Sequence, residues 1–327
     1  MEKELRLMKG NEAIAEAAIR CGTDAYFGYP ITPQSEVLEY LMSEKPHERT
    51  GMVVLQAESE VAAINMVYGA ASCGRMAITS SSSPGISLKQ EGISYIAGAE
   101  LPCVVVNVVR GGPGLGTIQP SQADYFQSTK GGGHGDYRLI VFAPASVQEM
   151  YDFVGLGFDL AFKYRNPVMI QTDGIIGQMM EKVELGEQKQ RRNPEDIIKQ
   201  CPWATTGKTN DRARNVVTSL DLEASSQEKF NQKLIAKYEV IKENEVRYEL
   251  FNTDDADYLL VSYGSSSRIC MNAMKMAREK GIKVGLMRLI TLFPFPEKKL
   301  AEFTDQIKGY LAVEMSSGQM VEDVKLA

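Results

Sequence analysis

The chain has 327 residues, of which 44% are hydrophobic and 24% charged. This balance is typical of a globular protein with room for two domains, and it excludes a disordered tail and a small disulfide scaffold. The 36 Lys and Arg residues against 42 Asp and Glu residues give a net charge of -6, which argues against a nucleic-acid partner.

Cysteine and histidine usage limits the chemistry that this chain can perform by itself. The two histidines, His47 and His134, leave little for a zinc site or a Ser-His-Asp triad, so catalysis must depend on carboxylates or a cofactor. The chain begins without an apolar signal-peptide run and has no stretch of about 20 apolar residues, so we expect a cytoplasmic protein without membrane contact. The cysteines are odd in number and contain no Cys-x-x-Cys pair, so we expect no four-iron cluster on this chain; they are Cys21, Cys73, Cys103, Cys201 and Cys270.

Residues 1–183 alternate short β-branched runs with amphipathic segments, which predicts one doubly wound α/β domain with a parallel sheet. An Ala-rich helix is predicted over residues 11–21, with Asn11 as its cap and Gly22 at its end. Strands are predicted at residues 25–28, 52–56, 76–79, 103–109, 139–142 and 168–171. Helices are predicted between them at residues 33–43, 59–72, 86–97, 146–164 and 174–180.

The composition changes over residues 184–255, which we interpret as a charged interdomain excursion. Within it, residues 227–247 predict an exposed, polar helix that cannot anchor a core. A second βα pattern covers residues 256–327 and predicts a smaller α/β domain. Its expected elements are strands at 258–263, 284–289 and 311–314, a helix at 268–280, a break at 292–296 and a helix beginning near residue 318. A fold of this type normally adds another strand, so we expect a chain truncated at its C-terminus.

Ligands of open α/β sheets bind beyond the carboxyl ends of the strands, so the loops after the predicted strands are the candidate sites. The loop at residues 28–33 presents the hydroxyl of Thr32, which either contacts a ligand or caps the next helix. The loop at residues 56–60 contains Glu58 and Glu60, and either glutamate can be a surface charge near a helix start. Glu60 precedes apolar residues that offer its carboxyl little hydration, which suits a group that exchanges protons.

Two further loops are rich in small residues. Residues 80–85 (SSSSPG) open a helix and either face a polar ligand or a neighbouring subunit, or form a flexible connection. Residues 110–117 (RGGPGLGT) follow an apolar strand, and Arg110 either binds a carboxylate in bidentate fashion or is solvated on a mobile glycine loop. This loop has neither the Walker spacing nor the dinucleotide fingerprint, so a P-loop is rejected.

The order of these segments is more specific than any of them alone. The chain contains GNEAIAEAAIRCG, YFGYPITPQSE, LQAESEVAAINMVYGA, TSSSSPGISL, VVRGGPGLGT, YGSSSR and VEMSSGQMVEDV. This series resembles the α subunit of 2-oxoacid:ferredoxin oxidoreductases, and is most similar to the branched-chain 2-oxoisovalerate type. The resemblance extends over nearly the whole chain and is weakest across the excursion. It implies a pyrimidine-binding thiamine diphosphate domain followed by a transketolase-C-terminal-like α/β domain.

The resemblance also implies an activity and roles for single residues. The activity is oxidative decarboxylation of a 2-oxoacid to acyl-CoA and CO2, with the electrons passed to ferredoxin. Glu60 matches the glutamate that hydrogen-bonds the N1′ atom of the cofactor, Thr32 matches the threonine that contacts substrate, and Arg110 is placed to neutralise the substrate carboxylate. Residues expected near the cofactor are Tyr29, Pro30 and Gln56, and Asn65 and Gln56 are further candidates to line the pocket.

The cofactor and partners implied by the resemblance are distributed over several chains. Thiamine diphosphate is shared with a β subunit that binds the diphosphate through Mg2+ and carries a [4Fe-4S] cluster, so we expect no metal on this chain. A γ subunit and a ferredoxin-like δ subunit are further partners, coenzyme A is a substrate, and the chain is expected to homodimerise through the complex. The alternatives are a 2-oxoglutarate- or pyruvate-specific member, a lipoamide-dependent oxoacid dehydrogenase subunit, and a noncatalytic assembly subunit.

Overall fold

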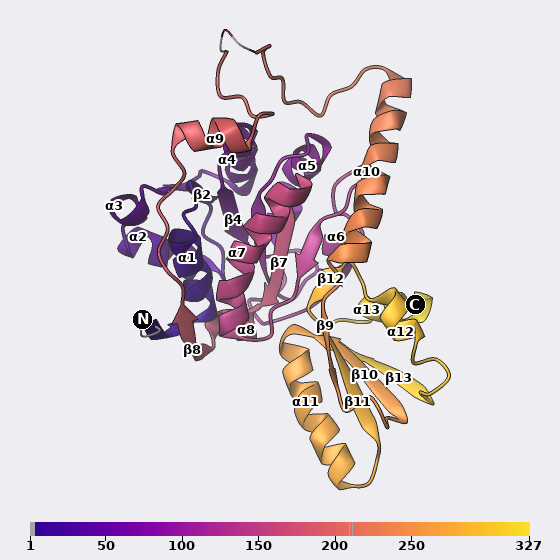
Figure 1. Ribbon diagram of the computed structural model, residues 1–327. Coiled ribbons are helices and arrows are strands. Elements are labelled where there is room, and N and C mark those ends of the chain that lie inside the picture. The colour runs from indigo at the N-terminus through magenta and orange to yellow at the C-terminus, as the bar shows by residue number, and fades with distance from the viewer. Residues whose placement is uncertain (1–3, 209, 211) are drawn as a thin grey trace.

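A seven-stranded sheet forms the centre of the computed structural model, which describes residues 4–208, 210 and 212–327 (Figure 1). The strand order is β12-β6-β7-β5-β4-β2-β3. Neighbouring strands run parallel except β12, which is antiparallel to β6. The bounds are β2 Ala25–Gly28, β3 Val53–Gln56, β4 Ala77–Ser81, β5 Val104–Val109, β6 Ile140–Phe142, β7 Val168–Asp173 and β12 Thr291–Phe293.

The central strands are buried on both faces because helices cover them. Every residue of β4, β5 and β7 is buried, as expected of parallel strands between two helical layers. Helix α1 (Gly10–Arg20) packs on α7 (Val147–Tyr164), and α4 (Glu60–Ser72) packs on α5 (Ser83–Gly98). Shorter helices are α2 (Ser35–Ser43), α3 (Pro46–Thr50), α6 (Tyr125–Thr129) and α8 (Gly174–Gln178). The predicted doubly wound α/β fold is confirmed, and strand bounds differ from the predicted ones by two residues or fewer.

One capping prediction is wrong. Helix α1 begins at Gly10, so Asn11 lies inside the helix, fully buried. Its side-chain Nδ2 donates to Pro33 O at 2.7 Å and to Glu36 Oε2 at 2.8 Å, so it fixes the start of α2 to α1. Gly22 follows the C-cap with a φ of +79°, as predicted for the residue that ends this helix.

Strands β1 (Glu4–Lys9) and β8 (Met180–Leu185) form an antiparallel ribbon that the sequence did not predict. The two segments are far apart in the chain, and neither has a continuous apolar run. The excursion contributes α9 (Pro194–Gln200) and α10 (Ala224–Asn244). Figure 1 shows α10 beside the large sheet, reaching down toward the smaller one.

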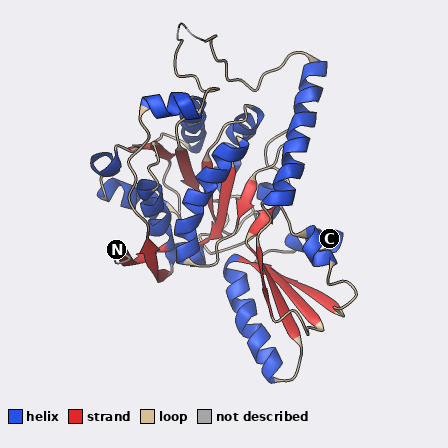
Figure 2. Ribbon diagram, viewed as in Figure 1, coloured by secondary structure: helices blue, strands red, loops and turns tan. Residues whose placement is uncertain are grey.

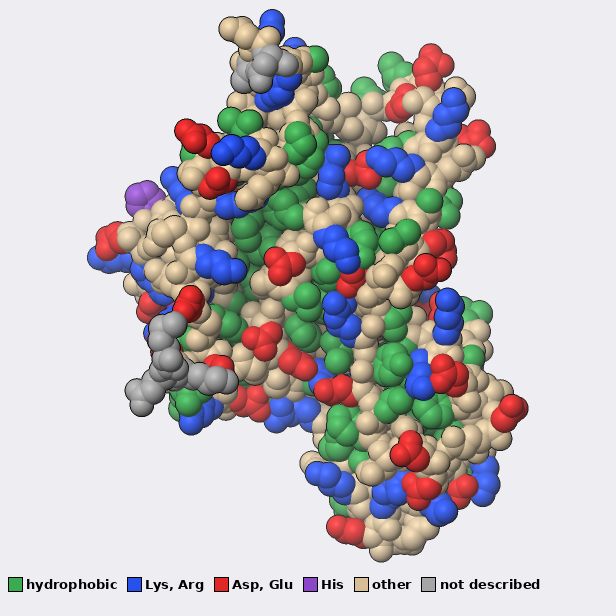
Figure 3. All heavy atoms as spheres, viewed as in Figure 1, with side chains coloured by type: hydrophobic (Ala, Val, Ile, Leu, Met, Phe, Trp, Pro, Cys, Tyr) green, Lys and Arg blue, Asp and Glu red, His purple; other side chains and the backbone are tan. Residues whose placement is uncertain are grey.

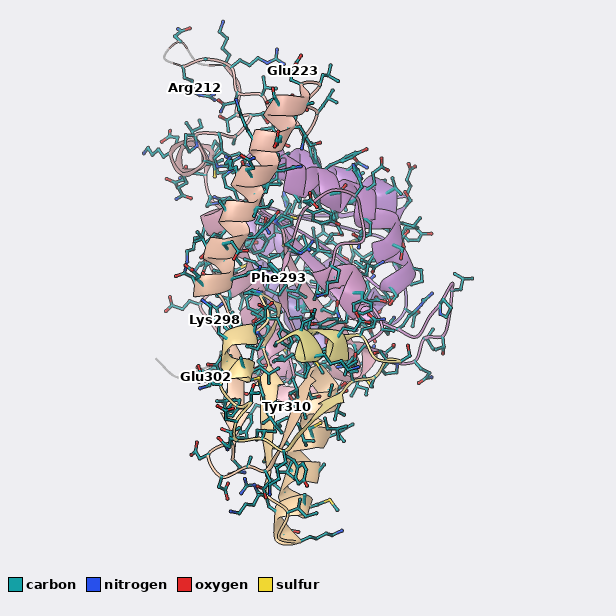
Figure 4. All side chains as sticks on the ribbon, turned by 90° about the vertical axis from the view of Figure 1, so that its right-hand side faces the viewer. Arg212, Glu223, Phe293, Lys298, Glu302 and Tyr310 are labelled. Carbon is teal, nitrogen blue, oxygen red and sulfur yellow. The ribbon has the colours of Figure 1, made fainter. Side chains whose placement is uncertain are left out.

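The expectation that this polar helix cannot anchor a core is wrong for α10. Leu234, Tyr238 and Ile241 are buried and belong to the main hydrophobic core. They are spaced by four and three residues, so they form one stripe on an otherwise polar helix. The Tyr238 ring lies 6.5 Å from the Phe293 ring, edge to face, and Figure 4 labels Phe293 beside the lower end of α10.

The second sheet has the order β13-β10-β11-β9. Its strands are β9 Tyr248–Phe251, β10 Tyr258–Tyr263, β11 Val284–Leu289 and β13 Gly309–Val313, with helices α11 Gly264–Glu279, α12 Glu297–Ala301 and α13 Met320–Leu326. Figure 2 shows α11 alongside this sheet. The segment after β11 was predicted as an irregular break. It instead forms β12, which leaves the smaller region and pairs with β6 of the large sheet.

Charged side chains of both signs alternate over the face drawn in Figure 3, without an extended area of one sign. None of the described helices combines the length and the apolar character that a membrane span requires.

Candidate active site

Four loops meet at one edge of the large sheet because β2, β3, β4 and β5 are parallel and their carboxyl ends point the same way. Contacts between these loops bring the predicted residues together. Arg110, after β5, donates from Nη1 to the carbonyl of Thr32, after β2, at 2.9 Å. Arg110 also donates its backbone N–H to Ser83 Oγ, after β4, at 3.0 Å. Thr32 does not cap α2, whose N-cap residue is Gln34.

Glu60 opens α4 directly after β3 and is buried, with 7% of its surface exposed. The preceding residue, Ser59, caps the helix by accepting from Ala62 N at 3.1 Å, which fixes the direction of the first turn. Glu58, by contrast, is exposed. Among the described residues no donor hydrogen-bonds the Glu60 carboxylate. A buried carboxylate in that state is costly unless a ligand or a cation satisfies it.

The Glu60 carboxylate lies against the first turn of α5. A Cβ at Gly85 would lie 2.7 Å from Glu60 Oε1 and would overlap Ser81 Oγ, so only glycine fits here. The hydroxyls of Ser81 and Ser82 are buried and have no partner among the described residues. Buried polar atoms without partners are rare in folded proteins and therefore mark a place where a ligand group can bind.

The outer serines of the same loop are paired. Ser80 Oγ donates to Gln34 Oε1 at 2.5 Å and contacts Tyr26 OH at 2.7 Å. Gln34 Nε2 in turn donates to Tyr29 O at 3.1 Å, so a buried chain of hydrogen bonds supports the loop after β2. Ser83 Oγ donates to Asp124 Oδ2 at 2.7 Å, and burial raises the pKa of that carboxyl. This loop is therefore a fixed structure and the flexible connection is excluded.

Lys89 is a feature of this site that sequence reasoning missed. It lies one turn after Gly85 on α5 and has no exposed surface. Its Nζ donates to Thr79 Oγ1 at 2.6 Å and to Ser80 O at 3.1 Å. Burial lowers the pKa of the Lys89 amine to about 7, and the charge of the nearby Glu60 opposes this shift. In the sequence, Lys89 is one polar residue in the mixed segment ISLKQEGIS, which gives no sign that it points inward.

Arg110 is buried, which excludes the solvated arginine on a mobile loop. Its Nη2 donates to Leu115 O at 2.9 Å, and Thr117 N closes the loop by donating to Gly111 O at 2.8 Å. Gly116 has a φ of +60° and approaches Gly111 too closely to carry a side chain. The Arg110 Nε atom is buried without a partner, and the guanidinium is not paired with a carboxylate among the described residues.

The other predicted residues lie at the rim of this cluster rather than inside it. Tyr29, Pro30 and Gln56 are exposed, and so are Thr32 and Asn65. Asn65 Nδ2 donates to Val61 O within its own helix at 2.8 Å. This local bond does not decide whether Asn65 lines a pocket. Large apolar side chains exposed on the same loops and elements are Tyr29, Val53, Leu55, Val61, Leu115 and Ile118.

Two family models together match most of the chain. Residues 16–244 match the family described as pyruvate flavodoxin/ferredoxin oxidoreductase, thiamine diphosphate-binding. The chain belongs to the 2-oxoacid:ferredoxin oxidoreductases. Residues 256–327 match the pyruvate:ferredoxin oxidoreductase core domain II. The family is the ferredoxin-linked one, which excludes a lipoamide-dependent dehydrogenase subunit.

Curated relatives of this oxidoreductase subunit carry more than one substrate name. Ketoisovalerate oxidoreductase subunit VorB of Methanothermobacter thermautotrophicus is 51% identical, over 98% of this chain and 89% of the relative. 2-Oxoglutarate synthase subunit KorA of Archaeoglobus fulgidus is 37% identical, over 98% of this chain and 91% of the relative. The relatives are subunits of larger oxidoreductases, so the family is shown while the substrate is not fixed.

A solved structure of the family shares the fold. The 2-oxoglutarate:ferredoxin oxidoreductase from Magnetococcus marinus, with 2-oxoglutarate, coenzyme A and succinyl-CoA bound, superposes with a TM-score of 0.86 at 26% identity. The match covers 99% of this chain and 60% of that chain. A split gene transketolase matches at 12% identity with a TM-score of 0.58, which shows the fold alone.

Proposed function

We propose that this chain is the α subunit of a 2-oxoacid:ferredoxin oxidoreductase that decarboxylates a branched-chain 2-oxoacid, 2-oxoisovalerate, and forms acyl-CoA in the cytoplasm. The observation that carries the proposal is the buried, unpartnered carboxylate of Glu60 at the carboxyl edge of the sheet. The substrate assignment rests on the 51% identity to a ketoisovalerate oxidoreductase subunit.

The residues present fit the aminopyrimidine end of thiamine diphosphate. Glu60 supplies a carboxylate acceptor, and the buried hydroxyls of Ser81 and Ser82 are available beside it. Thiamine diphosphate, when bound, supplies a carbanion sink for decarboxylation. Glu60 would hold the proton at N1′, which activates the cofactor's own amino group as a base. Tyr29, Pro30 and Gln56, at the rim, would border the ring.

The substrate side of the site would be formed by Thr32 and Arg110. Arg110 uses two of its five N–H donors on backbone carbonyls, and its side chain is fixed by these bonds. The remaining donors would donate hydrogen bonds to the carboxylate of the 2-oxoacid, and an oriented guanidinium loses little entropy on binding it. Thr32, whose carbonyl holds Arg110, would present its hydroxyl to the same substrate.

The diphosphate end of the cofactor would be held by a separate β subunit, through Mg2+, and the [4Fe-4S] cluster would lie there too. The exposed apolar side chains on the loops around Glu60 support this division, because a partner that covers them would also exclude water from the reaction. A γ subunit, a ferredoxin-like δ subunit and a second copy of the α chain would complete the complex. Coenzyme A would accept the acyl group and ferredoxin the electrons.

We also propose a division of the chain into three parts. Residues 1–183 form the pyrimidine-binding domain, residues 184–255 the excursion, and residues 256–327 the transketolase-C-terminal-like domain. The excursion and the last part each contribute to the core of the first, through α10 and β12.

The test is reconstitution of the complex from its subunits, followed by oxoacid-dependent viologen reduction over a substrate panel. Activity should require thiamine diphosphate and coenzyme A, with 2-oxoisovalerate giving the highest kcat/KM. A preference for 2-oxoglutarate would favour the second candidate, for which the 37% identical relative and the solved 2-oxoglutarate enzyme are the support. A complete complex that fails to reduce viologen with any oxoacid of the panel would favour a noncatalytic assembly subunit and contradict the proposal.

A further inference from the structure

The proposed function gives no task to the amine of Lys89. A fully buried lysine is uncommon, because removing an ammonium from water is costly unless partners compensate. Its two hydrogen-bond acceptors, Thr79 Oγ1 and Ser80 O, are neutral. The Thr79 hydroxyl donates onward to Phe27 O at 2.5 Å, so its lone pairs are oriented toward the lysine.

The position of Lys89 relative to Glu60 follows from α5. Gly85 contacts the Glu60 carboxylate, and Lys89 lies four residues later on the same helix, hence on the same face. Glu60 is the charged group that interacts with the Lys89 amine. The pair therefore consists of one buried cation and one buried anion, and the anion has no hydrogen bond from the described residues.

We propose that Lys89 is a positioning residue for Glu60: its ammonium, anchored by Thr79 and Ser80, orients the Glu60 carboxylate toward the cofactor. A carboxylate oriented in this way can accept a hydrogen bond from a protonated N1′ atom. This inference deepens the proposed function and rests on it for the identity of the cofactor. The position of Lys89 relative to Glu60 does not depend on that identity.

The amine is also poised to titrate near neutral pH. With a folded-state pKa of about 7 against a usual value of 10.5, Lys89 is protonated below about pH 7 and loses its proton above it. The unfolded chain keeps that proton up to the higher value, so it binds more protons than the folded chain between these limits. The folding equilibrium constant should therefore rise with pH over this window, by up to about tenfold per pH unit from this group alone.

The first experiment measures this linkage in the full chain without cofactor. Urea unfolding of the natural chain and of Lys89→Met is compared between pH 6.5 and pH 10. The ratio of the two folding constants should rise with pH above about 7. In the Glu60→Gln background the rise should begin at a lower pH, because the anion that favours protonation of Lys89 is gone. Lys298→Met, at an exposed lysine on α12 (Figure 4), is the matched control and should leave the ratio flat.

Equal pH dependence of the natural chain and Lys89→Met, or an onset that Glu60→Gln does not move, would overturn the proposal. Should Lys89→Met fail to fold, Thr79→Val retains the lysine and removes one acceptor of its ammonium. That variant should lower the pKa of Lys89 and also move the onset to lower pH. An unchanged onset in Thr79→Val contradicts the proposed anchor.

The second experiment measures the pH profile of the assembled complex. In the natural enzyme kcat should fall as pH rises through about 7, because the ammonium is lost. Lys89→Met should show no such fall and should resemble the natural enzyme at high pH, while its KM for coenzyme A stays the same. A Lys89→Met profile with the same alkaline fall overturns the inference. A complex that is inactive with every oxoacid counts against the proposed function only, because the unfolding experiment measures the influence of Glu60 on Lys89 independently of activity.

Discussion

Two serine-rich loops in this molecule look alike in sequence and differ in their hydrogen bonds. Each segment opens a 16-residue helix that follows a strand with parallel neighbours: residues 80–83 include the end of β4 and the start of α5, and residues 264–267 form the first turn of α11 directly after β10. In the first loop the two middle hydroxyls, of Ser81 and Ser82, have no partner within the described part of the chain. In the second loop all three hydroxyls donate hydrogen bonds.

The second loop joins the two α/β regions. Ser265 Oγ donates to Asp173 Oδ2 at 2.6 Å, and Ser266 Oγ donates to Gln122 Oε1 at 2.7 Å. Gln122 also donates to Tyr263 O at 3.0 Å, so its amide is bonded on both sides. The arginine after this loop, Arg268, forms an ion pair with Glu181 at 2.9 Å. Every polar group in this list is used within the chain.

The first loop differs because it and the adjacent Arg110 contain buried polar atoms without hydrogen-bond partners in the described part of the chain. Among the described residues, the Ser81 and Ser82 hydroxyls and the Arg110 Nε are buried without a hydrogen-bond partner. A buried donor or acceptor without a hydrogen bond lowers the free energy of unfolding by about 1–3 kcal/mol, and a bound ligand that supplies the missing bond can offset this cost. The comparison teaches that the serine pattern indicates a helix start, and only the hydrogen bonds distinguish a binding loop from a structural one.

The largest expected effect comes from removing the Glu60 carboxylate, which lies beside the first loop. Glu60→Gln in the assembled complex should lower kcat by about a hundredfold or more, because an amide cannot stabilise the proton at N1′ as a carboxylate does. Steady-state viologen reduction measures it. Glu58→Gln, at the exposed neighbour, is the control and should retain activity. Retained activity in Glu60→Gln with loss in Glu58→Gln would assign the role to Glu58.

A substitution of Arg110 tests whether its free N–H donors bind the substrate. Arg110→Ala should raise KM for the oxoacid about tenfold to a hundredfold, the equivalent of a lost charge-assisted bond, with little change in KM for coenzyme A. Arg268→Ala, at the arginine that follows the second loop, should leave both constants unchanged. Equal increases in the two KM values of Arg110→Ala would argue against a substrate role.

The second loop should matter for stability instead. Ser265→Ala removes the donor to the buried Asp173 carboxylate and should lower the free energy of unfolding of the full chain by about 1.5–3 kcal/mol. Burial already raises the pKa of Asp173, so the loss should be greater at pH 8 than at pH 4, where a neutral carboxyl needs the donor less. Urea titrations at both pH values measure this difference. An equal loss of unfolding free energy at both pH values would mean that Ser265 does not stabilise the ionised carboxylate of Asp173.

The smallest expected effect on stability comes from the unpartnered serine. Ser81→Ala should change the free energy of unfolding of the full chain by less than about 0.5 kcal/mol, since its hydroxyl makes no hydrogen bond there. In the assembled complex the same variant should weaken thiamine diphosphate binding severalfold. Fluorescence titration of the apo complex measures the affinity. Destabilisation as large as that of Ser265→Ala would remove the distinction between the two loops.

The sequence predicted the sheet well because its strands are local patterns. Runs such as the one at β5 are apolar and β-branched, and the strand bounds are set by adjacent Gly, Pro and Ser residues. The pairing of β1 with β8 and of β12 with β6 escaped prediction because it joins distant segments that carry no local mark. The stripe of α10 was missed because three buried residues in a polar helix do not change its composition.

The candidate site shows the same limit at the level of single residues. Thr32, Glu60 and Arg110 stand in loops with unusual neighbours, so the sequence could suggest them, and the fold brings their loops to one edge. Lys89 was invisible because its burial depends on the approach of β4 and α4, not on the residues beside it. The hydrogen bonds that separate Ser81 from Ser265 are likewise tertiary, which is why two similar segments could not be told apart.

The central claim is that the Glu60 carboxylate contacts the aminopyrimidine of thiamine diphosphate while another polypeptide holds the diphosphate. A crystallographic or cryo-electron-microscopy map of the assembled complex with the cofactor tests it directly. The account predicts a Glu60 carboxylate oxygen within about 2.6–3.2 Å of N1′ and the diphosphate on a different subunit. A cofactor bound entirely by this chain, or a Glu60 side chain turned into solvent, would contradict it.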